Sequence, residues 1–222
     1  MCFSATASFT AAATLIPVGI YCIATARKAG PGWLAFAAYP LAFGMQQAIE
    51  GLLWQGIDTG NPELVDAAAR GFTFFSHFFW LFWVPFSVWL LETDATRRKA
   101  LLFLVVFGAG YGLSMFVPLL LQEGWLKVEV VRHSLDYRAS MIYDGVVDRI
   151  IIRVVYAMQV VAAFMLSTNP KVRLYGVFIL LSVAGAFLSY RHAFVSVWCF
   201  FAALLSLYML YLLKGVAGQA RT

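Results

Sequence analysis

Seven runs of about 20 apolar residues, separated mostly by short connectors, constrain this chain more than any other feature. A bilayer core about 30 Å thick is crossed by about 20 helical residues, so each run is long enough to span it. We expect the spans to be Ala5–Thr25, Trp33–Gln55, Phe72–Leu91, Ala100–Leu121, Ile150–Ser167, Val172–Tyr190 and Phe194–Leu213. The sequence therefore predicts an all-α, multi-pass membrane protein with seven transmembrane helices, and a single domain over residues 1–222.

The composition agrees with lipid as the main solvent. The chain is 62% apolar and 12% charged, whereas a soluble domain has about 25% charged residues. These values argue against an ordinary soluble fold, a disordered chain and a disulfide-stapled secreted module. Neither G-x-S-x-G nor H-E-x-x-H occurs, so no recognisable hydrolase motif is present.

Basic residues predict the orientation, because short basic loops are retained on the cytoplasmic side of a membrane. The second and sixth connectors carry Arg70 and Arg191, whereas the first, third and fifth connectors and the C-terminal tail carry nine basic residues. These are Arg27, Lys28, Arg97, Arg98, Lys99, Lys171, Arg173, Lys214 and Arg221. We therefore expect an inner-membrane protein with its N-terminus outside and its C-terminus inside. The net charge of +5 follows from this asymmetry and does not indicate a nucleic-acid partner.

The long fourth connector, residues 122–149, is predicted to lie outside and to form a β-hairpin. Lys127–His133 and Tyr137–Tyr143 are β-rich runs on either side of Ser134-Leu135-Asp136. Such a hairpin could act as a lid over the outer mouth of the bundle, or it could simply shield the bundle end.

Small residues and prolines within the spans predict how the helices pack. Pro17, Pro40, Pro85 and Pro118 fall in four successive spans, and each removes a helix hydrogen bond. Gly108 and Gly112 form a G-x-x-x-G pair that allows two helices to approach closely.

The second span contains a polar group that lipid should exclude. Gln46, Gln47 and Glu50 are spaced by three and four residues, so they crowd one side of the helix near its outer end. Ionisable residues inside a membrane are costly, and they usually face the bundle interior, where they pair or serve a function. These three residues are therefore candidate site residues.

Other polar groups are predicted to lie at the same depth. At 1.5 Å per residue, Glu50, His77, Arg153 and Cys199 fall about 6 to 8 Å below the outer boundary. Arg149 shares a helix face with Arg153. The sequence therefore predicts one polar layer in the outer half of the bundle.

This layer is predicted to hold a metal ion or a redox centre. Thiolate and imidazole suit copper or zinc, and a carboxylate with imidazole suits iron or zinc. The candidate ligands are Cys2, Glu50, His77, His192 and Cys199. A haem held between His77 and His192 is a narrower version of this hypothesis, and a disulfide between Cys2 and Cys199 is also possible in an oxidising compartment.

Each group also has a purely structural interpretation, which the sequence leaves open. Glu50 and Arg153 could pair as a structural lock, and His77 could bond a neighbouring carbonyl. Cys199 could pack as a small apolar residue. Arg149 could extend, with Arg153, to lipid phosphates.

Three blocks of this sequence resemble an uncharacterised bacterial family of small multi-pass membrane proteins that begin Met-Cys-Phe-Ser-Ala. The blocks are Met1–Phe9 (MCFSATASF), Gln46–Trp54 (QQAIEGLLW) and Ser196–Ala203 (SVWCFFAA). The resemblance implies a bacterial inner-membrane protein and carries over no catalytic residue. It does single out Cys2, Glu50 and Cys199.

Three functions remain open from the sequence. The first is an outward-facing site for copper, iron, zinc or a redox centre. The second is a small-solute transporter or sensor in which Glu50 titrates. The third is a non-catalytic subunit or assembly factor of a larger membrane complex, or a homo-oligomer, suggested by the many aromatic residues of the third span. In each case the lipid bilayer is the surrounding partner, and whether the protein is an enzyme stays open.

Overall fold

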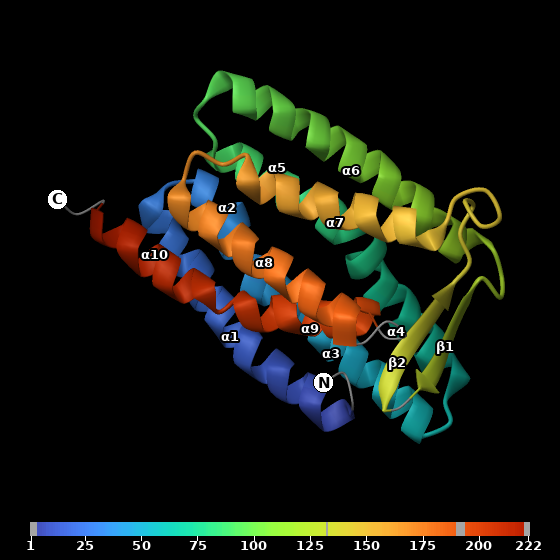
Figure 1. Cartoon of the computed structure of the whole chain (residues 1–222). Helices are drawn as coiled ribbons and strands as arrows, with labels where there is room; N and C mark the ends of the chain where they lie inside the picture. The colour runs from blue at the N-terminus through green and yellow to red at the C-terminus, as the bar shows by residue number, and fades with distance from the viewer. Residues whose placement is uncertain (1–3, 132, 190–193, 220–222) are drawn as a thin grey trace.

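Helices run side by side along the molecule in the computed structural model, which describes residues 4–131, 133–189 and 194–219 (Figure 1). The chain is mostly helical, at 79%, and a small two-stranded sheet lies at one end. The helices are α1 (Ala5–Ala29), α2 (Gly32–Ala37), α3 (Tyr39–Asp58), α4 (Pro62–Thr73), the π-helix η1 (Phe74–Phe79), α5 (Trp80–Leu91), α6 (Ala95–Leu121), α7 (Arg149–Met165), α8 (Pro170–Ser189), α9 (Phe194–Leu205) and α10 (Tyr208–Gln219).

Within the described ranges these segments form seven helical rods, namely α1, α2 with α3, α4 with η1 and α5, α6, α7, α8, and α9 with α10. Each rod overlaps one predicted span. The prediction of a mostly helical fold is therefore confirmed. In the described part of the chain, three stretches are long and apolar enough to cross a membrane, namely Ala5–Ala29, Pro62–Leu91 and Ala95–Leu121. That all seven rods cross a membrane stays a prediction.

The second rod is not the continuous helix that was expected over Trp33–Gln55. It consists of α2 and α3, which are separated at Ala38. Pro40 lies in the first turn of α3, where its missing N–H is tolerated. The same proline cannot continue the hydrogen bonds of α2, and this explains the interruption.

The third rod begins ten residues before the predicted start at Phe72, so that predicted boundary was wrong. Asn61 caps α4 by accepting a hydrogen bond from the Leu64 N–H at 3.1 Å, Pro62 is the first helical residue, and Glu63 lies in the first turn. An N-cap asparagine followed by proline and an acidic residue is a helix-start pattern. The segment expected to be a connector is therefore an amphipathic helix.

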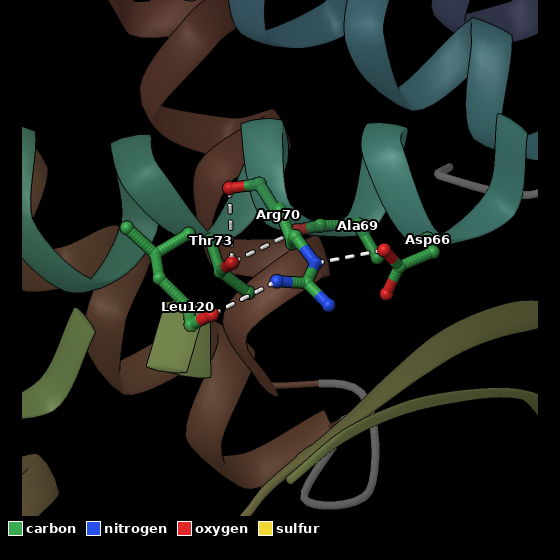
Figure 2. A network of polar contacts seen from close by, with 5 residues as sticks. All are labelled: Asp66, Ala69, Arg70, Thr73 and Leu120. Atoms are coloured by element: carbon green, nitrogen blue, oxygen red, sulfur yellow. Dashed lines mark hydrogen bonds and ion pairs between the residues drawn. The ribbon is translucent and has the colours of Figure 1, made fainter. Parts of the chain in front are cut away.

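Arg70, expected in that connector, instead joins α4 to the end of α6 (Figure 2). Its Nε donates to Asp66 at 2.8 Å, and its Nη1 donates to the backbone carbonyl of Leu120 at 3.1 Å. The last carbonyls of a helix have no partner within the helix. Arg70 supplies a hydrogen-bond donor to one of these carbonyls of α6, and it fixes the two helices to each other at this end.

A polar side chain of α7 compensates for Pro85 in α5. A proline at position 85 cannot donate a hydrogen bond to the carbonyl of Leu81, one turn earlier. The Nε2 atom of Gln159 donates to that carbonyl at 3.4 Å and to the carbonyl of Leu104 in α6 at 2.6 Å. One amide therefore links α5, α6 and α7.

Close packing of α6 against the third rod confirms the packing prediction for Gly108 and Gly112. A Cβ atom added at Gly108 would lie 2.1 Å from the carbonyl oxygen of Leu81, and one added at Gly112 would lie 2.9 Å from the Cα atom of Phe78. No side chain larger than hydrogen fits at these distances. The two glycines thus let α6 touch the backbone of α5 and η1.

The predicted hairpin is present, with strands β1 (Leu126–Val131) and β2 (Ser134–Ala139) paired antiparallel. Val131 pairs with Ser134, so the second strand begins where the turn was expected. His133 has φ 58°, in the left-handed region. The predicted turn at residues 134–136 was wrong because the two-residue connection contains none of the usual Asn-Gly or Asp-Gly signals.

The hairpin packs on the bundle through one face. Leu135 is fully buried in a cluster with Leu53, Trp54 and Ala68, and Tyr137 stacks on Phe72 with ring centroids 4.4 Å apart. Figure 1 shows the hairpin at the end of the bundle where α1 and α7 begin, while the α5–α6 connection and the end of α10 lie at the opposite end.

Glu92 organises the end opposite the hairpin. Its carboxylate is 2% exposed and accepts hydrogen bonds from the N–H groups of Thr93 and Asp94 in its own loop. It also accepts from the N–H and the hydroxyl of Thr168, in the loop between α7 and α8. This one side chain therefore holds two loops together.

Candidate functional site

An open pocket lies between the hairpin and the helices, with about 700 Å³ of empty space, part of it continuous with solvent. We call it the outer pocket. Its walls come from η1, α6, β2 and the loop after it, α7 and α9. The lining residues are Ser76, His77, Met115, Tyr137, Ala139, Met141, Arg149, Ile152, Arg153, Tyr156, Trp198 and Cys199.

The π-helix η1 brings His77 to this pocket. The N–H of Trp80 bonds to the carbonyl of Phe75, five residues earlier, which is the wide turn of a π-helix. Such turns are rare and often occur at functional sites. The hydroxyl of Ser76 lies 2.9 Å from Nδ1 of His77. His77 is thus held by a hydroxyl rather than by a neighbouring carbonyl. Among the described residues Nε2 has no hydrogen-bond partner, so it is the ring nitrogen open to a ligand.

The first turns of α7 place two cations in the outer pocket. Arg149 forms two hydrogen bonds to Asp144, at 2.7 and 3.0 Å, and the same carboxylate accepts the Met141 N–H at 2.8 Å. The Met141 N–H and the Arg149 guanidinium hold the pKa of Asp144 below its usual value. Arg153 lies one turn further along α7 and also lines the pocket. Arg149 is therefore paired with Asp144 in the loop that precedes α7.

The candidate residues of the second span lie in the core and do not line the outer pocket. Gln46, Gln47 and Glu50 are fully buried. The Trp80 indole donates to Oε1 of Gln46 at 2.8 Å, and Nε2 of Gln47 donates to Glu50 at 3.2 Å. The Gln46 amide is a neighbour of the Cys199 thiol. These residues therefore support the inner wall of the pocket from behind.

The structure brings together four of the predicted site residues in the outer pocket, namely His77, Arg149, Arg153 and Cys199. Cys2 and His192 lie outside the described residues. Among the residues that are described, no group of three or more His, Cys, Asp and Glu side chains could hold a metal ion. The prediction of copper, iron, zinc or haem therefore rests on positions the structure does not describe, and two guanidinium groups in the same pocket would repel a cation.

Cys199 is buried, and its thiol has no disulfide partner among the described residues. A disulfide with Cys2 stays a prediction, since Cys2 is among the residues without a description.

Several lining residues were missed by sequence reasoning. Tyr156 follows Arg153 by three residues and Arg149 by seven, so the three share one face of α7, and this spacing could have identified Tyr156. Trp198 precedes Cys199 directly and lines the same pocket. Ser76 has no signal beyond its position next to His77.

Comparison with known proteins gives a family match over nearly the whole chain. The model of a family of unknown function (DUF6629) matches residues 1–221. No curated protein and no solved structure matches the chain.

Proposed function

We propose that this chain, which belongs to the family of unknown function DUF6629, is an integral membrane protein whose outer pocket binds a small organic anion. The observation that carries the proposal is the convergence of Arg149, Arg153 and His77 on one pocket beneath the hairpin. The role we infer is that of a small-solute transporter or sensor.

The membrane assignment is supported by the outward faces of the helices. Besides the three long apolar stretches, other helices also point large apolar side chains outward, such as Met158 on α7 and Leu181 on α8, which are 64% and 62% exposed. On α6, Phe103 is 67% exposed. Large exposed apolar areas are uncommon on water-soluble monomers. Lipid would cover it.

The orientation we propose keeps the hairpin and the start of α1 outside. The end opposite the hairpin carries the last turn of α1 and the first turns of α6 and α8 (Figure 1). Those turns contain Arg27, Arg97 and Lys171 with their basic neighbours. Basic residues near span ends favour the cytoplasmic side, and the outer pocket would then open away from the cytoplasm.

Charge determines the class of ligand. Both charged side chains that line the outer pocket in the described part of the chain are arginines, and no carboxylate is among the lining residues. Arg149 has its charge partly balanced by Asp144. A pocket with low-dielectric walls and one sign of charge concentrates ions of the opposite sign. Guanidinium groups bind carboxylate and phosphate oxygens with two parallel hydrogen bonds.

Titration calorimetry with the protein in nanodiscs tests this proposal. The probes are acetate, succinate and inorganic phosphate, and Arg153→Gln is the variant. Loss of a hydrogen bond to a charged group costs about 1.5–3 kcal/mol, which corresponds to a roughly 10- to 150-fold weaker affinity.

Arg138→Gln is the matched control, because Arg138 is an exposed arginine of the hairpin that pairs with Glu129 and does not line the pocket. We expect this variant to bind as the wild type does. Equal weakening in both variants, or no anion binding by the wild type, would refute the proposal.

A further inference from the structure

A second cavity adjoins the outer pocket. It has about 390 Å³ of empty space, part of it continuous with solvent, and we call it the inner cavity. Tyr156, Trp198 and Cys199 line both spaces, so the two share a wall. The rings of Tyr156 and Trp198 meet edge to face, with centroids 5.3 Å apart, at this shared boundary. A ligand in the outer pocket therefore lies next to a second space deeper in the bundle.

The inner cavity differs from the outer pocket in its chemistry. It has no charged lining residue within the described ranges, and aromatic rings dominate its wall, including Tyr39, Phe43, Trp80 and Phe164. Phe43 and Trp80 stack with centroids 3.9 Å apart. Ligand cavities commonly have apolar and aromatic walls with a few polar groups. The aromatic lining of the inner cavity suits a planar ring or a short alkyl chain.

One polar group of the inner cavity has no hydrogen-bond partner in the part of the chain that the structure describes. Tyr175 is fully buried and lines the cavity, and its hydroxyl lacks a partner among the described residues. The neighbouring Tyr39 hydroxyl, in contrast, bonds to Ser87 at 2.9 Å. Buried hydroxyl groups are nearly always bonded. The Tyr175 hydroxyl is therefore a candidate partner for an oxygen of a bound molecule.

We propose that the anion is amphipathic, with its charged group at Arg149 and Arg153 and its ring or short chain in the inner cavity. An oxygen at the end opposite the charge bonds the Tyr175 hydroxyl. A ring-bearing carboxylate with a distal hydroxyl has this chemistry. This inference rests on the proposed function, because the arginines hold the charged end.

Three probes that share one charged group test the inference in nanodiscs of zwitterionic lipid. Acetate carries the charge alone, phenylacetate adds a ring, and 4-hydroxyphenylacetate adds the distal oxygen. Titration calorimetry, with empty nanodiscs subtracted for partitioning into lipid, should give phenylacetate at least tenfold higher affinity than acetate. The hydroxylated probe should bind several-fold tighter again.

Two variants locate the ring. Ala202 lines the inner cavity and not the outer pocket, so Ala202→Leu should remove most of the advantage of phenylacetate and leave acetate binding unchanged. Ala13→Leu is the matched control, because Ala13 is an exposed alanine of α1. Tyr175→Phe keeps the shape of the wall, and it should abolish the preference for the hydroxylated probe alone. This second variant keeps the test decisive if Ala202→Leu does not fold.

The outcomes separate the two proposals. If no probe binds, the proposed function fails, and this inference fails with it. If acetate and phenylacetate bind equally and Arg153→Gln weakens both, the anion site stands and the inner cavity is not its extension. If Ala202→Leu and Tyr175→Phe both leave the wild-type preferences intact, the inference is also overturned. If phosphatidylglycerol in the nanodisc competes with the probes, a lipid is the source of the amphipathic anion. If it does not compete, the anion is a free solute.

Discussion

Replacing Glu92 tests how strongly the end opposite the hairpin is held together. The Glu92 carboxylate accepts two hydrogen bonds from its own loop and two from Thr168, at 2.7 and 3.0 Å. A hydrogen bond to a charged group contributes about 1.5–3 kcal/mol. At the lower end of that range, the two bonds between loops give about 3 kcal/mol for Glu92→Ala. Glu92→Gln keeps one acceptor oxygen, so about half of that loss is expected.

Thermal unfolding in mild detergent, followed by tryptophan fluorescence, measures the effect. A change of 1 kcal/mol shifts the melting temperature of a chain of this size by roughly 2–4 °C. We expect Glu92→Ala to melt roughly 6–12 °C lower than wild type and Glu92→Gln to be intermediate. Glu123→Gln, at an exposed position, is the control and should melt as wild type does. An unchanged melting temperature in Glu92→Ala would contradict the role of this carboxylate.

The pH dependence gives an independent check on Glu92. Burial opposes ionisation of its carboxyl group, but hydrogen bonds from Asp94, Thr168 and Thr93 outweigh burial and hold the pKa below its ordinary value of 4.5. A carboxyl group with a lowered pKa in the folded state contributes stability that is complete above pH 4.5 and is lost as the pH falls through the folded-state pKa. The difference in melting temperature between wild type and Glu92→Gln should therefore shrink as the pH falls from 7 to below 4.

Two further predictions concern the helices. Gln159→Leu leaves the carbonyls of Leu81 and Leu104 without their amide donor, and should cost about 1–3 kcal/mol in unfolding measurements. The cost should be smaller in a Pro85→Ala background, because the restored N–H can bond Leu81, and an equal cost in both backgrounds would rule out this compensation. For the orientation, a green fluorescent protein fused to the C-terminus should fluoresce, and an alkaline phosphatase fused there should be inactive. Active phosphatase would invert the proposed topology.

Helix and strand content could be predicted from the sequence because it depends on local patterns. Runs of about 20 apolar residues located every helical rod, and the β-rich runs around residue 130 located the hairpin. The start of α4 was also encoded locally, in Asn61-Pro62-Glu63, but the apolar run beginning at Phe72 concealed it. Errors of this kind concern boundaries, where a weak capping signal competes with a strong hydrophobic one.

The candidate site was predicted only in part, because depth along a helix does not determine direction around it. Glu50, His77, Arg153 and Cys199 were expected in one layer, and all but Glu50 line the outer pocket. Glu50 instead lies in the core beside Gln47.

The sequence by itself determined that this is a chain of apolar helices with a hairpin and with basic residues gathered at alternate connectors, because hydrophobic length and charge are properties of short segments. The tertiary structure alone decided that α7, η1, α9 and β2 meet around one pocket, and that an apolar cavity adjoins it. The outer pocket brings together residues more than 100 positions apart, such as His77 and Cys199. Their arrangement depends on how helices rotate and approach when they pack. No local pattern contains that information.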